Sequence, residues 1–70
     1  MIYVKAEHYA EDRQLIIHLV IHTACCKSHK FFREYKEGQY VDCETEQPVG
    51  PGWDKTINMY RRVYKRDQTS

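Results

Sequence analysis

The apolar run from Gln14 to Ala24 constrains the fold of this chain more than any other stretch. In a β-strand, successive side chains point to opposite faces, and here the alternation separates four aliphatic side chains from two histidines. One face carries Leu15, Ile17, Leu19 and Ile21, and the other carries Ile16, His18, Val20 and His22. The density of Ile and Val favours a strand, which we predict here. Only the alternative, a helix, would bring His18 and His22 together, one turn apart.

Length and composition narrow the class of protein. Seventy residues predict one small domain, residues 1–70, with a thin core. The net charge is only +1, so no overall field draws the chain to nucleic acid or to an anionic membrane. Three cysteines, two of them adjacent, indicate a reducing compartment. Because we find no signal-peptide pattern and the apolar run is about half a membrane span, we expect a cytoplasmic protein.

The segment before the apolar run extends the β prediction. Residues 2–9 alternate between two sets of side chains, one of them largely apolar, which indicates a strand. The polar residues that follow, 10–13, are few enough to turn the chain straight back. We therefore predict an N-terminal hairpin whose second arm is the apolar run.

The middle of the chain allows two interpretations. Around a two-residue turn at Glu37 and Gly38, counting outwards pairs two aromatic residues and two residues of opposite charge. The predicted pairs are Tyr35 with Tyr40, Arg33 with Asp42, and Phe32 with Cys43. The alternative is a short helix over residues 28–36, capped by Ser28 and closed by Gly38. We adopt the hairpin.

The last third begins with a loop and then remains open between helix and strand. Both prolines and two of the three glycines lie within Gln47–Gly52, which predicts the loop. Beyond it, the β-branched and aromatic residues favour a strand, but one helical face would gather a set of large side chains behind Asp54 as N-cap. That set is Trp53, Ile57, Tyr60 and Tyr64.

Together these patterns predict a mainly-β fold. We expect a small antiparallel meander or a partly closed barrel of four or five strands. The alternative is an α+β fold with a short helix at 28–36, a C-terminal helix at 54–66, or both.

Histidine and cysteine raise the question of a metal. Zinc takes four nitrogen or sulfur ligands in a tetrahedron, and the candidate set is His18, His22, Cys26 and His29. On a strand, however, His18 and His22 lie roughly 13 Å apart, at about 3.3 Å per residue. The adjacent thiols of Cys25 and Cys26 would point apart on an extended chain. We therefore expect no metal and no cofactor, and in the absence of a nucleophile motif we expect no enzyme.

Nucleic-acid binding is the alternative function. Cations that neutralise phosphates, interleaved with aromatic rings that stack on bases, are typical of proteins that bind single strands. The C-terminal segment has this composition, with Trp53, Tyr60 and Tyr64 among the candidate cations Lys55, Arg61, Arg62, Lys65 and Arg66.

Protein binding is the function that we adopt. Nine aromatic residues, six of them Tyr, exceed what a core of this size can bury completely, and exposed Tyr, Trp and Arg anchor interfaces. The candidate contact residues are Tyr40, Asp42, Glu44, Trp53, Tyr60 and Tyr64. We expect a small non-enzymatic regulator or inhibitor of a larger protein, of the kind that compact genomes such as those of phages encode. A homodimer formed through a free sheet edge is a further possibility.

Overall fold

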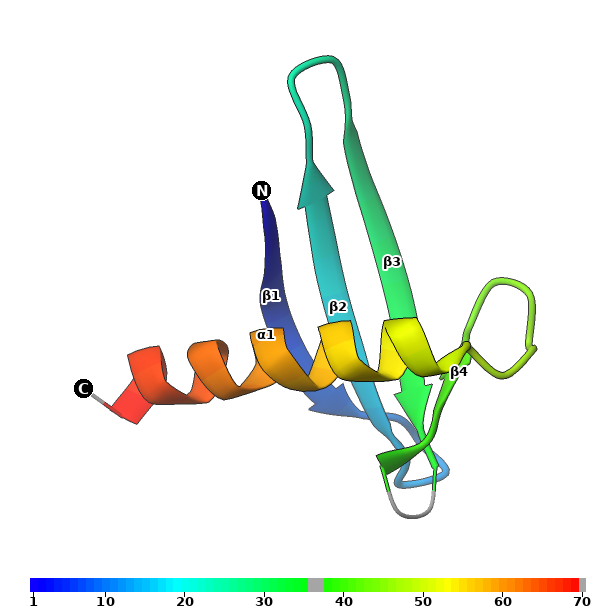
Figure 1. Ribbon diagram of the computed structural model, residues 1–70. Coiled ribbons are helices and arrows are strands. Elements are labelled where there is room, and N and C mark those ends of the chain that lie inside the picture. Colours follow the sequence, from blue (N-terminus) through cyan, green and yellow to red (C-terminus); the bar gives the residue numbers. More distant parts are fainter. Residues whose placement is uncertain (36–37, 70) are drawn as a thin grey trace.

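A four-stranded antiparallel sheet carries one long helix across its face (Figure 1). The computed structural model describes residues 1–35 and 38–69. The strands are β1 (Ile2–Tyr9), β2 (Leu15–His22), β3 (Lys27–Glu34) and β4 (Tyr40–Asp42), and the helix is α1 (Pro51–Thr69). The sheet order is β1-β2-β3-β4, which confirms the predicted meander. Residues 28–34 lie in β3, so a helix at 28–36 is wrong, whereas a C-terminal helix is present.

Strand β2 is the apolar run of the sequence, and it pairs with a neighbour on each side. Ile17 and Leu19 are completely buried towards α1, in one cluster with Ile57 of the helix. Ile16 and Val20 are buried on the opposite face of the strand. A strand that is buried on both faces needs apolar side chains almost continuously, which explains the composition of this run.

Strand β1 contains an irregularity that the sequence did not indicate. Val4 pairs with Leu19 but Ala6 pairs with His18, so the register shifts at Lys5. An extra residue in one strand moves the following side chains to the other face. Glu7 therefore lies on the same face as Val4, beneath the helix, whereas the predicted alternation of residues 2–9 would put these two residues on opposite faces.

The β3–β4 pairing is antiparallel as predicted, but its register differs by one residue. Phe32 pairs with Asp42, and Glu34 pairs with Tyr40. The predicted turn at 37–38 falls partly outside the described residues, and Gly38 has a positive φ of 78°. Because a shift of one residue exchanges the two faces, the pairing turns Tyr40 into the core with Phe32.

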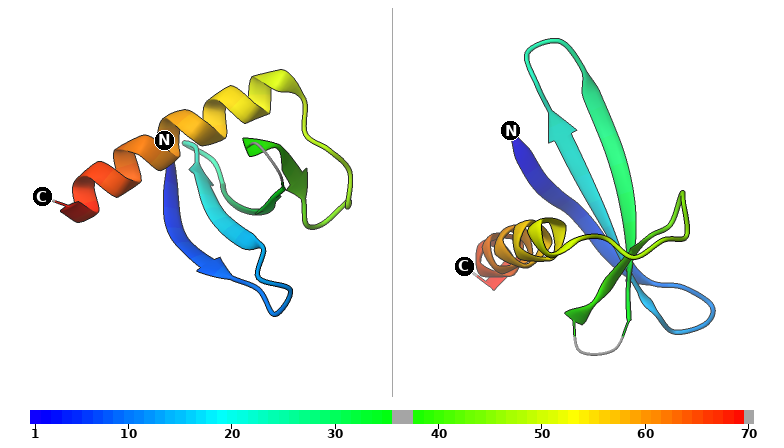
Figure 2. Two further views of the ribbon diagram at one scale, coloured as in Figure 1. Left: turned by 90° about the horizontal axis from the view of Figure 1, so that it is seen from below. Right: turned by 45° about the vertical axis from the view of Figure 1, so that its right-hand side comes forward.

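Helix α1 begins three residues earlier than predicted. Pro51 and Gly52, expected in the loop, form its start, where the fixed φ of proline suits the first helical position. Asp54 lies inside the first turn and its backbone N–H donates to the carbonyl of Gly50 at 3.0 Å, so it is not the N-cap. The helix lies across the sheet (Figure 2), and its Ile57 is fully buried in the core cluster. Among the described residues, no helix is long and apolar enough to cross a membrane.

Candidate functional site

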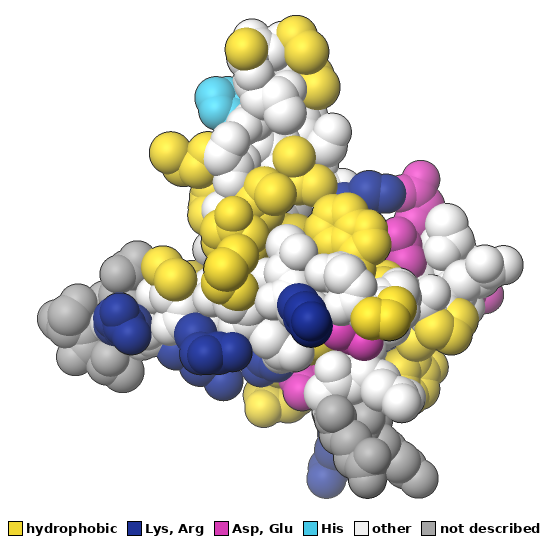
Figure 3. Space-filling view, viewed as in Figure 1, with side chains coloured by type: hydrophobic (Ala, Val, Ile, Leu, Met, Phe, Trp, Pro, Cys, Tyr) yellow, Lys and Arg dark blue, Asp and Glu magenta, His cyan; other side chains and the backbone are white. Residues whose placement is uncertain are grey.

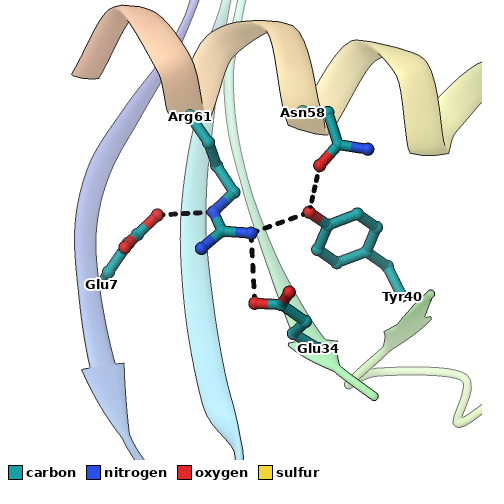
Figure 4. A network of polar contacts seen from close by, with 5 residues as sticks. All are labelled: Glu7, Glu34, Tyr40, Asn58 and Arg61. Carbon is teal, nitrogen blue, oxygen red and sulfur yellow. Dashed lines mark hydrogen bonds and ion pairs between the residues drawn. The ribbon is translucent and has the colours of Figure 1, made fainter. Parts of the chain in front are cut away.

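Arg61 is the centre of a polar network between the helix and the sheet (Figure 4). Its Nε donates to Oε1 of Glu7 on β1 at 2.7 Å, and its Nη1 lies 3.1 Å from Oε2 of Glu34 on β3. The same Nη1 donates to the hydroxyl of Tyr40 at 2.9 Å, and that hydroxyl donates to Oδ1 of Asn58 at 2.5 Å. One helical side chain thus joins three strands to α1.

The surroundings of this network shift two pKa values. Burial alone would lower the pKa of Arg61, but hydrogen bonds with Glu7 and Tyr40 outweigh it, and the pKa is raised. Burial raises the pKa of Tyr40 in spite of the nearby guanidinium. Arg61 therefore stays charged and Tyr40 stays neutral at physiological pH, and the network serves to hold the helix in place.

The predicted contact residues divide between the core and the surface. Tyr40 is only 1% exposed, so its ring belongs to the core. Tyr60 and Tyr64 are partly buried against the core cluster. Trp53 is 37% exposed, with its ring 5.6 Å from that of Phe32.

The two predicted acidic contacts lie beside Trp53 and share one lysine. Nζ of Lys30 is 3.8 Å from Oδ2 of Asp42 and 4.0 Å from Oε2 of Glu44. Lys30, Asp42 and Trp53 also line a hollow of about 260 Å³. The structure thus brings Asp42 and Trp53 to one surface, connects Glu44 to it through Lys30, and leaves Tyr40 out of it.

An apolar surface continues from Trp53 along the helix and onto the sheet. Ile2 and Tyr60 pack at the edge of the core, and Ile2 pairs with Ile21 across the strands, so all three lie on the helix side. Val63, one turn after Tyr60, is 49% exposed. Figure 3 shows hydrophobic side chains gathered above the helix and over the upper sheet. We name this surface the apolar shelf: Ile2, Ile21, Trp53, Tyr60 and Val63.

Sequence reasoning found two members of the apolar shelf, Trp53 and Tyr60, and missed the other three. The available signal was the alternation of β1 and β2, which places Ile2 and Ile21 on the core face near the end of each strand. Their partial exposure depends on where the helix crosses the sheet, which the sequence pattern did not reveal.

The candidate nucleic-acid cations all lie on α1, and one of them, Arg61, is turned towards the sheet. Arg61 is held by Glu7 and Glu34 and faces the sheet. Arg62 and Lys65 line, with Asn58 and Arg61, a hollow of about 240 Å³ on the side of the helix away from the apolar shelf. Lys55 and Arg66 are exposed, two turns before and one turn after Arg62 on the same side of the helix.

His18 and His29 lie side by side on neighbouring strands, on the face of the sheet opposite Leu19 and the helix. His18 Nε2 is 2.7 Å from His29 Nδ1, and the ring of His18 stacks on Phe31 with centroids 4.3 Å apart. Burial lowers the pKa of His18, with smaller contributions from His29, Lys5 and His8. This hydrogen bond needs one ring nitrogen to accept, so it is lost when both rings are protonated.

The His18 pair predicts a pH dependence of stability. Since the folded chain lowers the pKa of His18, the unfolded chain takes up this proton first, and stability falls as the pH drops below about 6.5. We expect His18→Gln to lose less stability between pH 8 and pH 5 than the native chain in chemical denaturation. His22→Gln, at the exposed end of β2, is the matched control and should keep the native dependence. Equal pH profiles for all three chains would contradict the prediction.

The candidate zinc ligands do not converge. His18 and His29 are adjacent, but His22 is four residues along β2 from His18, and Cys26 lies in the turn beyond it. Within residues 1–35 and 38–69 no group of three or more His, Cys, Asp or Glu side chains is placed to hold a metal ion.

A third hollow, of about 630 Å³, lies where the loop after β4 meets the start of the helix. Its lining includes Tyr35, Val41, Pro48 and Asp54. Oδ1 of Asp54 is shielded from solvent and has no hydrogen-bond partner among the described residues.

No protein-family model, curated protein or solved structure matches this chain.

Proposed function

We propose that this protein is a non-enzymatic binder that regulates or blocks a larger protein, which it contacts through the apolar shelf. The observation that carries the proposal is the partly exposed Trp53, together with the hydrophobic side chains that gather above the helix in Figure 3. Exposed aromatic side chains anchor protein interfaces, and polar residues form the rim around the apolar area. Here Lys30, Asp42 and Glu44 supply the polar rim beside the Trp53 ring.

Glutamate at Val63 provides the sharpest test. The Val63 side chain is half exposed, so the charge should change stability by no more than about 0.5 kcal/mol. It would, however, place an unpaired charge in a desolvated contact, and we expect the partner's affinity to fall by about 2 kcal/mol or more, roughly 30-fold. The measurement is capture of the partner from the source cells by immobilised chain, followed by titration of the purified partner.

The same titration contains its control and a second signal. Tyr9→Glu introduces the same negative charge at an exposed residue beyond the other side of the helix. This variant should bind the partner as the native chain does. Trp53 is the only tryptophan, so its emission should shift to shorter wavelength when the partner covers the shelf. Binding that is unaffected by Val63→Glu would contradict the proposal. Sedimentation that shows a dimer dissociated by Val63→Glu would identify a second copy as the occupant.

Nucleic-acid binding is the second candidate, and the hollow lined by Arg62 and Lys65 favours it. Both cations lie on the side of the helix away from the shelf, so the two functions use different residues. Titration with single- and double-stranded oligonucleotides over a range of salt separates them. Affinity that falls steeply with salt and requires Arg62 and Lys65 would support the nucleic-acid function.

A further inference from the structure

The β2–β3 hairpin reaches well past the helix, and its tip is exposed on every side (Figures 1 and 2). Thr23 closes this tip. Its backbone N–H donates to the carbonyl of Cys26 at 2.9 Å, and the N–H of Cys26 donates to Oγ1 of Thr23 at 3.2 Å. The four residues 23–26 therefore form a compact turn and not the extended chain expected from the sequence.

The turn brings two thiols together that an extended chain would separate. Oγ1 of Thr23 is 3.7 Å from Sγ of Cys25 and 3.3 Å from Sγ of Cys26, and neither cysteine is in a disulfide. Hydrogen bonds from Thr23 and then from Cys26 lower the pKa of the Cys25 thiol. Both thiols are exposed, so a soft metal ion or metalloid can reach the two sulfur atoms.

The number and kind of the metal-binding atoms indicate which class of metal the two cysteines can bind. Two sulfur atoms converge here, and the described residues place no third metal-binding side chain with them, so tetrahedral zinc lacks half of its ligands. Thiolates select soft acceptors over hard cations. The site therefore suits a soft acceptor that is satisfied by two protein sulfurs.

We propose that Cys25 and Cys26, held by the Thr23 turn, form a dithiol site for a thiophilic metal or metalloid of low coordination number. Trivalent arsenic in phenylarsine oxide is a suitable probe, because it bridges two thiols. Two S–As bonds form, the As–O bond breaks, and the two thiol protons leave with the oxygen as one water molecule. No oxidant or reductant takes part. The inference is independent of the proposed protein contact, which lies along the helix.

The experiment uses the full chain, reduced with a phosphine, and native mass spectrometry with phenylarsine oxide in the presence of excess monothiol. We expect one arsenical per chain with loss of one water. Cys25→Ser and Cys26→Ser should each weaken binding on the order of 10²-fold or more, the gain that two linked groups provide over one. Cys43→Ser is the matched control, since Cys43 follows β4 and lies outside the turn. It should bind as the native chain does.

Variants of Thr23 test whether the turn itself contributes to binding, or whether two cysteines adjacent in sequence are sufficient. Thr23→Ser keeps the hydroxyl that contacts both sulfurs and should retain binding, whereas Thr23→Val removes it and should weaken binding severalfold. Far-UV circular dichroism establishes that each variant is folded. An adduct that survives Cys25→Ser or Cys26→Ser, or that requires Cys43, would overturn the proposal.

Discussion

Replacing Arg61 with Ala is expected to destabilise the domain by about 3 kcal/mol or more, the cost of leaving buried charges without their partner. The Arg61 side chain is 12% exposed, and those of Glu7 and Glu34 are 14% and 25% exposed. The substitution leaves both carboxylates beneath the helix and removes a donor from the hydroxyl of Tyr40. Since a domain of this size has only a few kcal/mol of stability, we expect most molecules to unfold.

Urea denaturation, followed by circular dichroism and Trp53 fluorescence, measures this loss. Arg62→Ala is the matched control, because its side chain is exposed on the same turn, and we expect a change within about 0.5 kcal/mol. Adding Glu7→Gln and Glu34→Gln to Arg61→Ala should recover part of the stability by removing the unpaired charges. Equal effects at Arg61 and Arg62 would show that the network does not hold the helix.

Ile57→Ala is expected to cost between about 2 and 5 kcal/mol, the range for deleting a large aliphatic side chain from a core. Ile57 is the only fully buried side chain among the described residues of the helix, and it packs in one cluster with Val4, Leu19 and Phe32. A cavity at this point removes the main apolar contact between α1 and the sheet. We expect the helix to detach before the strands separate.

Met59→Ala tests whether the loss belongs to burial and not to the helix itself. Met59 is 51% exposed on the same helix, and alanine favours helix at least as well, so we expect less than about 0.5 kcal/mol. Hydrogen exchange should show faster exchange throughout α1 in Ile57→Ala and native exchange in Met59→Ala. If Ile57→Ala lowers the free energy of unfolding no more than Met59→Ala does, the assignment of Ile57 to the core is contradicted.

Strong local patterns predicted the strands well. The apolar run became β2 because period-two alternation and β-branched residues agreed with a central position in the sheet. The tail was ambiguous because Thr, Ile, Tyr and Val favour strands. The decisive contributions, burial of Ile57 and the Arg61 network, are contacts with the sheet that a local pattern does not contain. Tertiary contacts therefore determined the helix.

The errors in the candidate site come from register. Counting outwards from an assumed two-residue turn misplaced β4 by one position, which exchanged its faces and turned Tyr40 from the surface to the core. The irregularity at Lys5 moved Glu7 under the helix in the same way. The turn at residues 23–26 likewise brought two adjacent thiols together. The first two are shifts of one residue and the third is a turn of four residues, and hydrophobic periodicity resolves neither.

The order β1-β2-β3-β4 also has a kinetic consequence. Each strand pairs with its neighbour in the chain, so each pairing closes a short loop at a small cost in conformational entropy. The ion pair between Arg61 and Glu7, in contrast, joins residues 54 positions apart. The sheet can therefore form one hairpin after another, as is usual for fast-folding domains with local contacts. Docking of α1 onto the sheet, which brings Arg61 to Glu7, then completes the cooperative unit.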